Sequence, residues 1–429
     1  MKKLIQKILF YLARAILKKY HPQVVGITGS VGKTSVKDAV SLVVSKRYPS
    51  RATEKNYNNE IGVPLTIIGA NKSPGKSLIR WFGIIVKAVS LLVWKDKKYP
   101  QMLVLEMGAD KPGDIRTLTQ LAPCTIGIIT ALAPAHMEFF PSFEALEWEK
   151  KEMYRHLTSS SCALVNIDDP LLAKEKDALH SRVFTYGTQP NADVYASDVS
   201  VQCRFLNGVY TGGACFFVTY SNQTVRIELP SVSSVQMALA TLPAVAVGSA
   251  FQIPLETVAD ALRDFHQPQG RMRILSGIKR TLLIDDTYNS SPLAARAALD
   301  TLRSFEIDES SRRIAVLGDM RELGESSKSE HYDIGRYVAE KGVDILVTVG
   351  KEANEIGKGA RDAGLNNDFM LHFDDADSAK IPVQNLLKKG DCVLIKGSQA
   401  VRLEKVVEEV MAEPQRAKEL LVRQGSEWK

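Results

Sequence analysis

The sequence predicts an α/β protein with mostly parallel sheets, and three observations support this prediction. Short β-branched runs alternate with helical patterns from residue 23 onward, as in parallel sheets covered by helices. A glycine-rich loop joins the first run to the next helical pattern. The stretch Gln267–Gly270 breaks a helical region, and a second complete alternation follows it. We therefore expect a basic helix over 1–22, a P-loop-type central domain over 23–267 and a Rossmann-like α/β domain over 268–429.

Short apolar runs along the chain are the predicted strands of the two sheets. Two runs at Phe216–Tyr220 and Val225–Leu229 differ from the rest, because only four polar residues separate them, and they predict an antiparallel hairpin. Helical patterns follow the other runs, so those strands are expected to be parallel. They are Val24–Thr28, Leu103–Glu106, Thr125–Thr130, Ala163–Asn166, Leu282–Asp285, Ile314–Gly318, Ile345–Val349 and Val393–Lys396.

The composition excludes several classes of protein. At 429 residues, with 45% hydrophobic and 24% charged residues, the chain is long enough for two or three globular domains. The net charge of +6 is modest and no basic run is interleaved with aromatic residues, so nucleic-acid binding is not expected. The five cysteines are scattered without a Cys-x-x-Cys pair, which argues against zinc or disulfides and favours a reducing cytoplasm. No apolar run reaches the roughly 20 residues that cross a bilayer.

The glycine-rich loop has the residue types that bind a nucleotide phosphate. Its glycines let backbone N–H groups approach phosphate oxygens, and the helix predicted over Val36–Val44 adds positive charge at its N-terminus. We expect Lys33 to reach the β- and γ-phosphates and Thr34 to offer its hydroxyl to Mg²⁺. An ordinary glycine-rich turn is the alternative, because Ile27 stands where the strict pattern has glycine. The candidate nucleotide-binding residues are Gly29, Ser30, Gly32, Lys33, Thr34 and Ser35.

Two further residues follow strand ends, where a metal ion can bind. Glu106 ends an apolar strand, and an acid at this place in a P-loop sheet holds Mg²⁺. The alternative is an acid that leaves the strand into solvent. His136 lies just past another strand, at the edge where an α/β sheet collects its ligands, which favours a metal-ligand role. The charged segment Glu147–Tyr154 by itself indicates a helix with a solvated face.

Two apolar segments with basic residues stand apart from this pattern. Residues 1–20 carry apolar side chains on one helical face and lysines and arginines on the opposite one, without a signal-peptide cleavage site. We slightly favour a helix packed on the next domain; the alternative is a helix in the plane of an anionic membrane surface. Residues 78–98 are apolar with tryptophans and basic flanks. A buried core helix is the default there, and peripheral membrane contact is the alternative.

Seven sequence blocks, between residue 23 and about residue 410, resemble those of the Mur ligase family in their order and spacing. The glycine-rich loop is similar to the ATP loop of that family, and the blocks with Glu106 and His136 are similar to its metal-binding blocks. The last three look most like the family member that adds D-alanyl-D-alanine to UDP-N-acetylmuramoyl-tripeptide. The blocks are Thr28–Thr34, Asn58–Pro64, Glu106–Ala109, Ala135–Glu138, Asp285–Pro292, Leu317–Gly324 and Lys396–Ser398.

The resemblance implies an ATP-dependent amide-bond ligase of peptidoglycan precursor synthesis. ATP would phosphorylate a substrate carboxylate, and an incoming amine would displace the phosphate from the acyl phosphate. By the family pattern, Thr34 and Glu106 hold one Mg²⁺ and His136 holds a second. Lys150 falls where the family carries a carbamylated lysine, whose anionic oxygen is a metal ligand. Lys33, His136 and Lys150 are therefore the implied catalytic residues.

The resemblance also implies the substrates and the residues that meet them. Arg271 and Asp286 match positions that clasp ATP from the C-terminal domain. A muramoyl-peptide and D-alanyl-D-alanine are the expected small-molecule substrates of a monomeric, cytoplasmic enzyme with peripheral membrane contact left open. The implied substrate-site residues are Asn58, Asn59, Asn289, Ser291 and Lys396.

The sequence departs from the family pattern in two places. Only 22 residues precede the first predicted strand, where a further UDP-sugar-binding domain is expected, and Ser231–Ser234 replace a Gly-x-His-Asn block. These departures and the two basic apolar helices leave a lipid-linked or other carboxylate acceptor as an alternative substrate. Folate-type glutamate ligases rank lower, because they are expected to lack the last blocks. A non-catalytic ATP-binding module on a membrane or partner is the alternative from another class.

Overall fold

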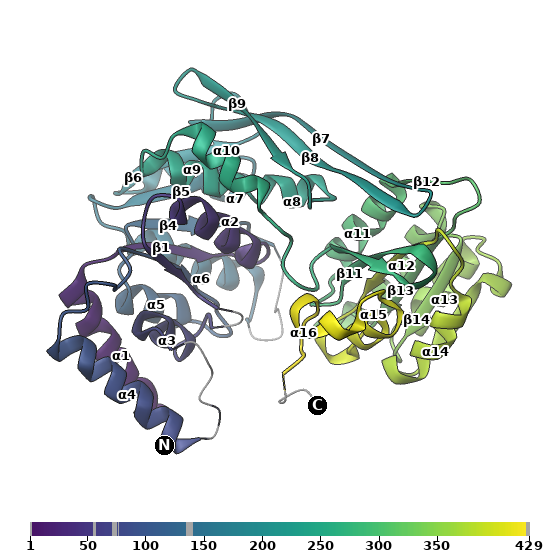
Figure 1. Cartoon of the computed structure of the whole chain (residues 1–429), viewed down its shortest axis with the longest axis horizontal. Helices are drawn as coiled ribbons and strands as arrows, with labels where there is room; N and C mark the ends of the chain where they lie inside the picture. Colours follow the sequence, from purple (N-terminus) through teal and green to yellow (C-terminus); the bar gives the residue numbers. More distant parts are fainter. Residues whose placement is uncertain (1, 55–56, 71–74, 76, 134–139, 426–429) are drawn as a thin grey trace. The chain divides into compact units, whose positions relative to one another are not determined.

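The computed structural model describes residues 2–54, 57–70, 75, 77–133 and 140–425, and it forms two compact units (Figure 1). Strands β7 (Val194–Leu206) and β8 (Val209–Tyr220) contribute residues to both units. The domain boundary expected at residues 267 and 268 stays a prediction. Unit 1 consists of Met1–Val199, Cys215–Glu228 and Ala238–Phe265, and unit 2 consists of Ser200–Ala214, Leu229–Met237 and His266–Lys429.

The sheet to which unit 1 contributes is parallel around β1 (Gln23–Thr28), with the strand order β2-β3-β1-β4-β5-β6-β7-β8-β9. β1 pairs with β3 (Met102–Glu106) on one side and β4 (Ile126–Ile129) on the other. Because β1 and β3 are parallel, Ile27 lies opposite Glu106, and the glycine loop leaves β1 at the same edge. The remaining strands are β2 (Ser50–Ala52), β5 (Cys162–Asn166), β6 (Arg182–Gly187) and β9 (Gln223–Leu229).

Helices cover both faces of the unit 1 sheet (Figure 1). α2, α9 and α10 lie on one face, α3, α5 and α6 lie on the other, and α1 and α4 pack together beside α3. Buried residues of α1, α4 and β3 share one hydrophobic core. The helix bounds are α1 (Lys2–Tyr20), α2 (Lys33–Ser45), α3 (Gly62–Ile68), α4 (Leu78–Val93), α5 (Asp114–Leu121), α6 (Phe143–Arg155), α7 (Pro170–Ala173), α9 (Leu242–Ala250) and α10 (Leu255–Arg263); α8 (Val235–Leu239) joins the two units in sequence.

Unit 2 is built on a six-stranded sheet of order β10-β11-β16-β13-β14-β15. β10 pairs with β11 in antiparallel fashion and the other pairs are parallel. One hydrophobic core packs against each face of this sheet. The strands are β10 (Arg273–Gly277), β11 (Thr281–Asp286), β13 (Arg313–Gly318), β14 (Ile345–Val349), β15 (Met370–Phe373) and β16 (Cys392–Lys396), and β12 (Glu306–Ile307) pairs with β7. The helices are α11 (Pro292–Ser304), α12 (Ser327–Glu340), α13 (Asn354–Asp362), α14 (Ala376–Leu386), α15 (Glu404–Val410) and α16 (Ala417–Leu420).

The predicted parallel strands coincide with eight of these strands to within a residue or two at each end. The predicted hairpin is β8 and β9, and its loop is shorter than expected. Ser221 and Asn222 both have positive φ, at 48° and 65°, which is the geometry of a two-residue hairpin turn. The helix predicted from Val36 begins three residues earlier, at Lys33, because the end of the glycine loop supplies its first turn.

α1 and α4 are both packed helices. Leu9, Ala13 and Ile16 of α1 are fully buried, as expected for the packed alternative. Ile84 and Ala88 of α4 are buried in the same core, but other apolar residues of α4 remain exposed, so a fully buried core helix was the wrong expectation. Across the described part of the chain, no helix is long and apolar enough to cross a membrane.

Candidate active site

The glycine loop between β1 and α2 is held in a conformation that requires glycine. Gly29 has φ 139°, and a Cβ atom there would lie 2.1 Å from the hydroxyl of Thr130. Gly32 has φ 82° and precedes the first turn of α2. Ile27, at the position where the strict pattern has glycine, is fully buried in β1 and belongs to the strand. The loop is therefore a variant whose first glycine is Gly29, two positions after the place where the strict pattern has glycine.

Lys33 begins α2 and turns back over the loop. Its ammonium donates to the carbonyls of Gly29 at 2.7 Å and Ser30 at 3.2 Å. No side chain caps the N-terminus of α2, and the first turn of a helix presents N–H groups without intrahelical acceptors. An ammonium and a helix N-terminus at one place favour a polyanion such as a nucleotide phosphate.

Glu106 lies beside the loop at the end of β3 and is buried, with 3% of its surface exposed. Its carboxylate accepts from the Thr34 hydroxyl at 3.1 Å and from the Asn58 side-chain amide at 3.1 Å. The carbonyl of Asn58 also accepts from the N–H of Gly108 at 2.7 Å, which holds Asn58 against the strand end. Mg²⁺ prefers oxygen ligands, and a hydroxyl and a carboxylate oxygen lie side by side here, so these residues fit that ion.

Asn59, the other predicted substrate residue of this block, has a local role in the structure. Its side-chain oxygen accepts from the N–H groups of Ile61 at 3.1 Å and Gly62 at 3.0 Å. These bonds satisfy donors at the start of α3. The exposed side chain still has its amide group available to a ligand.

Lys150 of α6 is a buried lysine with 3% of its surface exposed. Burial, and then the positive charge of Lys33, lower the pKa of Lys150 to about 7. The carboxylates of Glu149, Asp110 and Asp114 act in the opposite direction. Glu149 itself accepts two short bonds of 2.7 Å from backbone N–H groups at the start of α5. Near neutral pH a substantial fraction of Lys150 is therefore a neutral amine that can act as a nucleophile.

His136, which the sequence indicates as a metal ligand, lies outside the described residues.

A second cluster lies in unit 2, where β11 and β16 run side by side. The ammonium of Lys396, 2% exposed, donates to the carboxylate of Asp286 at 2.7 Å and to the carbonyl of Asn289 at 3.0 Å. The second oxygen of Asp286 accepts from the N–H of Met272 at 3.1 Å. The structure thus joins three of the predicted residues of this unit into one buried network.

The other predicted residues of unit 2 lie around this network. The guanidinium of Arg271 lies 4.2 Å from the centroid of the Tyr288 ring, and the N–H of Tyr288 donates to the Gly270 carbonyl at 2.9 Å. Ser291 is the N-cap of α11, where its hydroxyl accepts from the N–H of Ala294 at 3.4 Å. The Ser291 hydroxyl thus caps α11, and the side chain of Asn289 is exposed to solvent.

Sequence reasoning assigned no role to Asp285, which is fully buried beside Asp286. One carboxylate oxygen accepts from the Thr287 hydroxyl at 2.6 Å, and the other has no hydrogen-bond partner among the described residues. Burial raises the pKa of Asp285 to about 6. The doubled aspartate at a strand end was the only available signal, and it could not tell which acid is ion-paired.

Ser398 is a second residue of unit 2 that the sequence left without a role. Its hydroxyl accepts from the N–H of Arg321 at 2.8 Å, and its own N–H donates to the carbonyl of Asp319 at 3.0 Å. These bonds tie the segment after β16 to the segment after β13. Both segments belong to blocks that the sequence had singled out, although no spacing rule connects them.

Comparison with known proteins identifies the family. Residues 27–79 and 87–245 match the Mur ligase middle domain, and residues 270–399 match the Mur ligase glutamate ligase domain. A UDP-N-acetylmuramoyl-tripeptide–D-alanyl-D-alanine ligase of Mycobacterium leprae is 31% identical over 403 residues, which cover 89% of this chain and 72% of that protein. The chain belongs to the Mur ligase family. This Mur ligase is accordingly an enzyme that forms carbon–nitrogen bonds.

A second relative of this Mur ligase has the same name as the Mycobacterium leprae protein, and two solved structures are named MurF. The Bacillus subtilis protein is 28% identical over 403 residues, covering 94% of this chain and 79% of that protein. The crystal structure of MurF ligase from Thermotoga maritima in complex with ADP is 26% identical, with a TM-score of 0.74 over 97% of this chain and 84% of that one. A MurF structure from Acinetobacter baumannii is also 26% identical, with a TM-score of 0.75 over 93% and 79% of the two chains. The predicted fold class is confirmed.

Proposed function

We propose that this Mur ligase joins D-alanyl-D-alanine to UDP-N-acetylmuramoyl-tripeptide, with ATP converted to ADP and phosphate. The observation that carries the proposal is the cluster of Lys33, Thr34 and Glu106 at one edge of the unit 1 sheet. This cluster lies in a chain that matches ligases of that name over most of their length. The glycine loop and the ADP-bound MurF relative both support ATP as the nucleotide.

The reaction has two steps whose charges suit these residues. A carboxylate oxygen of the muramoyl-peptide attacks the γ-phosphorus of ATP, the bond to the bridging oxygen breaks, and ADP leaves. The amine of D-alanyl-D-alanine then attacks the acyl carbon, loses a proton, and phosphate leaves. Lys33 is the cation that opposes the negative charge developing on the transferred phosphoryl group.

Mg²⁺ is part of the proposal through the oxygens of Thr34 and Glu106. When bound, it supplies positive charge for the phosphate oxygens. The Asn58 amide donates to Oε1 of Glu106. The other carboxylate oxygen, Oε2, accepts from Thr34 and is therefore directed toward the loop. His136 keeps its predicted place at a second metal ion as part of the same proposal.

Lys150 is proposed to carry a carbamate. Its neutral amine attacks the carbon of CO₂, loses a proton and becomes an anionic oxygen ligand. The depressed pKa supports this reaction, because only the unprotonated amine is a nucleophile. The positive charge of Lys33, which opposes a protonated Lys150, favours the carbamate in the same place.

Residues of unit 2 are also assigned to the substrates, following the family pattern. Arg271 and Asp286 are assigned to ATP, and Asn289, Ser291 and Lys396 are assigned to the incoming amine. Lys396 pairs directly with Asp286, and Asn289 is exposed and able to bind a ligand. Asn58 and Asn59 of unit 1 are also assigned to the substrate. We also propose that the enzyme is a monomer and works in the cytoplasm, where its five cysteines stay reduced.

Phosphate release is the direct test. It should require the muramoyl-tripeptide, D-alanyl-D-alanine and ATP together, and the product should contain the new amide bond by mass spectrometry. Lys33→Ala should abolish release with an unchanged circular dichroism spectrum. Lys46→Ala, at the other end of α2, is the matched control and should stay active, because its ion pair in the described part of the chain is with exposed Asp264. Release with another amine but none with D-alanyl-D-alanine would contradict the assignment of the amine substrate.

A further inference from the structure

α4 presents a continuous apolar stripe to solvent. The stripe follows the spacing of one helix face, with residues three or four positions apart. No charged residue lies within it. It continues past the helix end to Trp94, which is 70% exposed. Its members, between 44% and 84% exposed, are Leu78, Ile79, Phe82, Val86, Val89 and Val93.

The opposite face of α4 is anchored, so the stripe does not arise from a loosely placed helix. Ile84, Ala88 and Leu91 are buried in the unit 1 core. The ammonium of Lys19 donates to the carbonyls of Leu91 at 3.0 Å and Leu92 at 2.9 Å. The hydroxyl of Tyr20 donates to the carbonyls of Leu91 at 3.0 Å and Trp94 at 3.1 Å. α4 is thus apolar on two faces, and only one of them is covered by the core.

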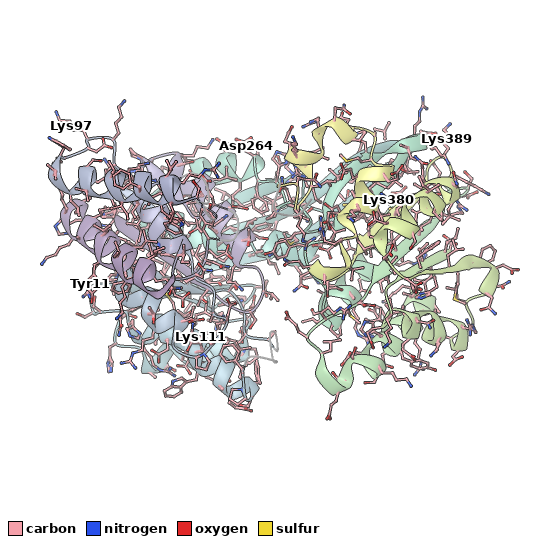
Figure 2. The ribbon with its side chains drawn as sticks, turned by 90° about the horizontal axis from the view of Figure 1, so that it is seen from below. Tyr11, Lys97, Lys111, Asp264, Lys380 and Lys389 are labelled. Carbon is pink, nitrogen blue, oxygen red and sulfur yellow. The ribbon has the colours of Figure 1, made fainter. Side chains whose placement is uncertain are left out.

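Exposed basic residues lie on both helices and on the segment that follows α4. Arg80 follows Ile79 in sequence and is exposed on α4, and Tyr11 of neighbouring α1 is 68% exposed. Figure 2 shows Tyr11 and Lys97 at this edge of unit 1. The sequence has no acidic residue in α1 and only Asp96 between positions 77 and 98. The exposed basic residues described in the two segments are Lys7, Arg14, Lys18, Arg80, Lys87, Lys95, Lys97 and Lys98.

The centre of the stripe lies outside the part of the chain that matches the family. The middle-domain match begins at residue 27 and omits residues 80–86. α1, Phe82 and Val86 therefore lie outside the matched residues. Leu78, Ile79, Val89 and Val93 lie within the matched residues, so the family match leaves out the middle of the stripe and keeps its ends.

We propose that α1 and α4 dock unit 1 on an anionic lipid surface, with α4 lying in the plane of the interface. An exposed apolar face with a basic rim is the pattern of helices that bind such surfaces. Each lysine or arginine near an anionic surface strengthens binding by about fivefold. Tryptophan at the end of the stripe suits the headgroup level. α4, with 16 residues, is shorter than the roughly 20 that span a bilayer, so the helix lies on the membrane.

Vesicle flotation of the full chain tests this proposal. The vesicles contain either phosphatidylcholine alone or equal parts of phosphatidylcholine and phosphatidylglycerol. We expect binding to the anionic vesicles that high salt weakens. Phe82→Glu with Val86→Glu should reduce the partition coefficient by at least about tenfold, because two buried apolar groups are replaced by charges.

The matched control places the same two charges elsewhere. Val209→Glu with Ile381→Glu changes two exposed apolar residues of β8 and α14, at 59% and 51% exposure, and should leave flotation unchanged. Equal loss of binding in both variants would show that net charge alone is responsible and would overturn the proposal. Absence of flotation would overturn it too. So would a concentration-dependent dimer, measured by light scattering, that Phe82→Glu with Val86→Glu disrupts while lipid binding persists. None of these outcomes depends on turnover, so the proposed ligase activity is tested separately.

Discussion

The hydroxyl of Thr34 and the carboxylate of Glu106 lie 3.1 Å apart, although 72 positions separate them in the chain. Parallel pairing of β1 with β3 produces this proximity, because both strands end at the same edge of the sheet. The second oxygen of Glu106 is occupied by the amide of Asn58. The pair is therefore an oriented set of oxygen donors for a cation beside the phosphate loop.

Glu106→Gln should weaken the response of the enzyme to Mg²⁺. The substitution keeps the size of the side chain and removes the negative charge that attracts the ion. We expect the Mg²⁺ concentration for half-maximal phosphate release to rise by at least about tenfold. Glu60→Gln, which among the described residues removes a pair with exposed Lys111, is the control and should leave the Mg²⁺ titration unchanged. An unchanged titration for Glu106→Gln would contradict the assigned role.

Gly29→Ala should disrupt the phosphate loop. The new Cβ atom would lie 2.1 Å from the Thr130 hydroxyl and 3.0 Å from the backbone nitrogen of Thr130, and φ is 139°. We expect ADP affinity, measured by titration calorimetry, to fall at least about tenfold, since the loop can no longer follow the phosphates. Gly357→Ala in α13 meets no atom within 4 Å and should bind ADP normally. Normal binding by Gly29→Ala would show that the loop tolerates a side chain.

Lys150→Met should reveal the lowered pKa of Lys150 as a pH-dependent gain in stability. Between pH 7 and about 10 the unfolded chain holds a proton on Lys150 that the folded chain lacks, so wild-type stability rises with pH in that range. In CO₂-free buffer at pH 7, the inactive variant should therefore unfold at a higher urea concentration than the wild type. The difference between the urea midpoints of the variant and the wild type should narrow toward pH 10.

The neighbouring Lys151 provides the contrast for this measurement. Lys151 pairs with Glu147 and with Glu175, the latter at 2.8 Å, and its pKa is raised. Lys151→Met should therefore lower the urea midpoint at pH 7. If Lys150→Met and Lys151→Met shift the urea midpoint in the same direction, the lowered pKa of Lys150 is not the source of the change in stability.

Asp285→Asn should stabilise unit 2 at neutral pH. The folded-state pKa of Asp285, about 6, lies above the ordinary value of 3.8, so its contribution to stability is present below pH 3.8 and is lost as pH rises through 6. The amide oxygen can still accept from Thr287. We expect a gain of up to about 3 kcal/mol at pH 7, measured by urea unfolding, that shrinks below pH 5. A variant that is less stable at both pH values would contradict this interpretation.

Lys396→Met should destabilise unit 2, because it leaves the Asp286 carboxylate buried without its partner. Removal of one member of a buried pair costs about 3–5 kcal/mol. Lys396→Met with Asp286→Asn should recover much of that loss, because no unpaired charge remains. The four proteins of this double-mutant cycle are compared by urea unfolding. Additive losses in the cycle would show that the 2.7 Å pair contributes no coupling.

The strands could be predicted where both faces of the sheet are covered. β3 and β16 are buried at every position, and burial on both sides requires continuous apolar runs that the sequence displays directly. β15 is not among the predicted strands, because Leu371 and His372 are exposed and the run is short. An edge strand of this kind is specified by its pairing with β14 and not by its composition.

The candidate site was predicted where a motif coincides with a strand end, as at Lys33, Thr34 and Glu106. The roles of Asn58 and Asp285 could not be predicted in the same way from the sequence. Asn58 acts through its amide on Glu106 and through its carbonyl on Gly108, and both partners are distant in sequence. Asp285 and Asp286 are adjacent acids, and only the position of Lys396 decides which of them is ion-paired.

The sequence by itself determined the alternation of strands and helices, the glycine loop and the basic apolar character of residues 78–98, because these depend on local chemistry and spacing. Tertiary structure decided which face of α4 is covered. Ile84 and Phe82 are similarly apolar and lie two positions apart, yet one is 8% exposed and the other 69%. Periodicity shows that a helix has apolar faces, but only the neighbours that pack against it determine which face remains in contact with solvent.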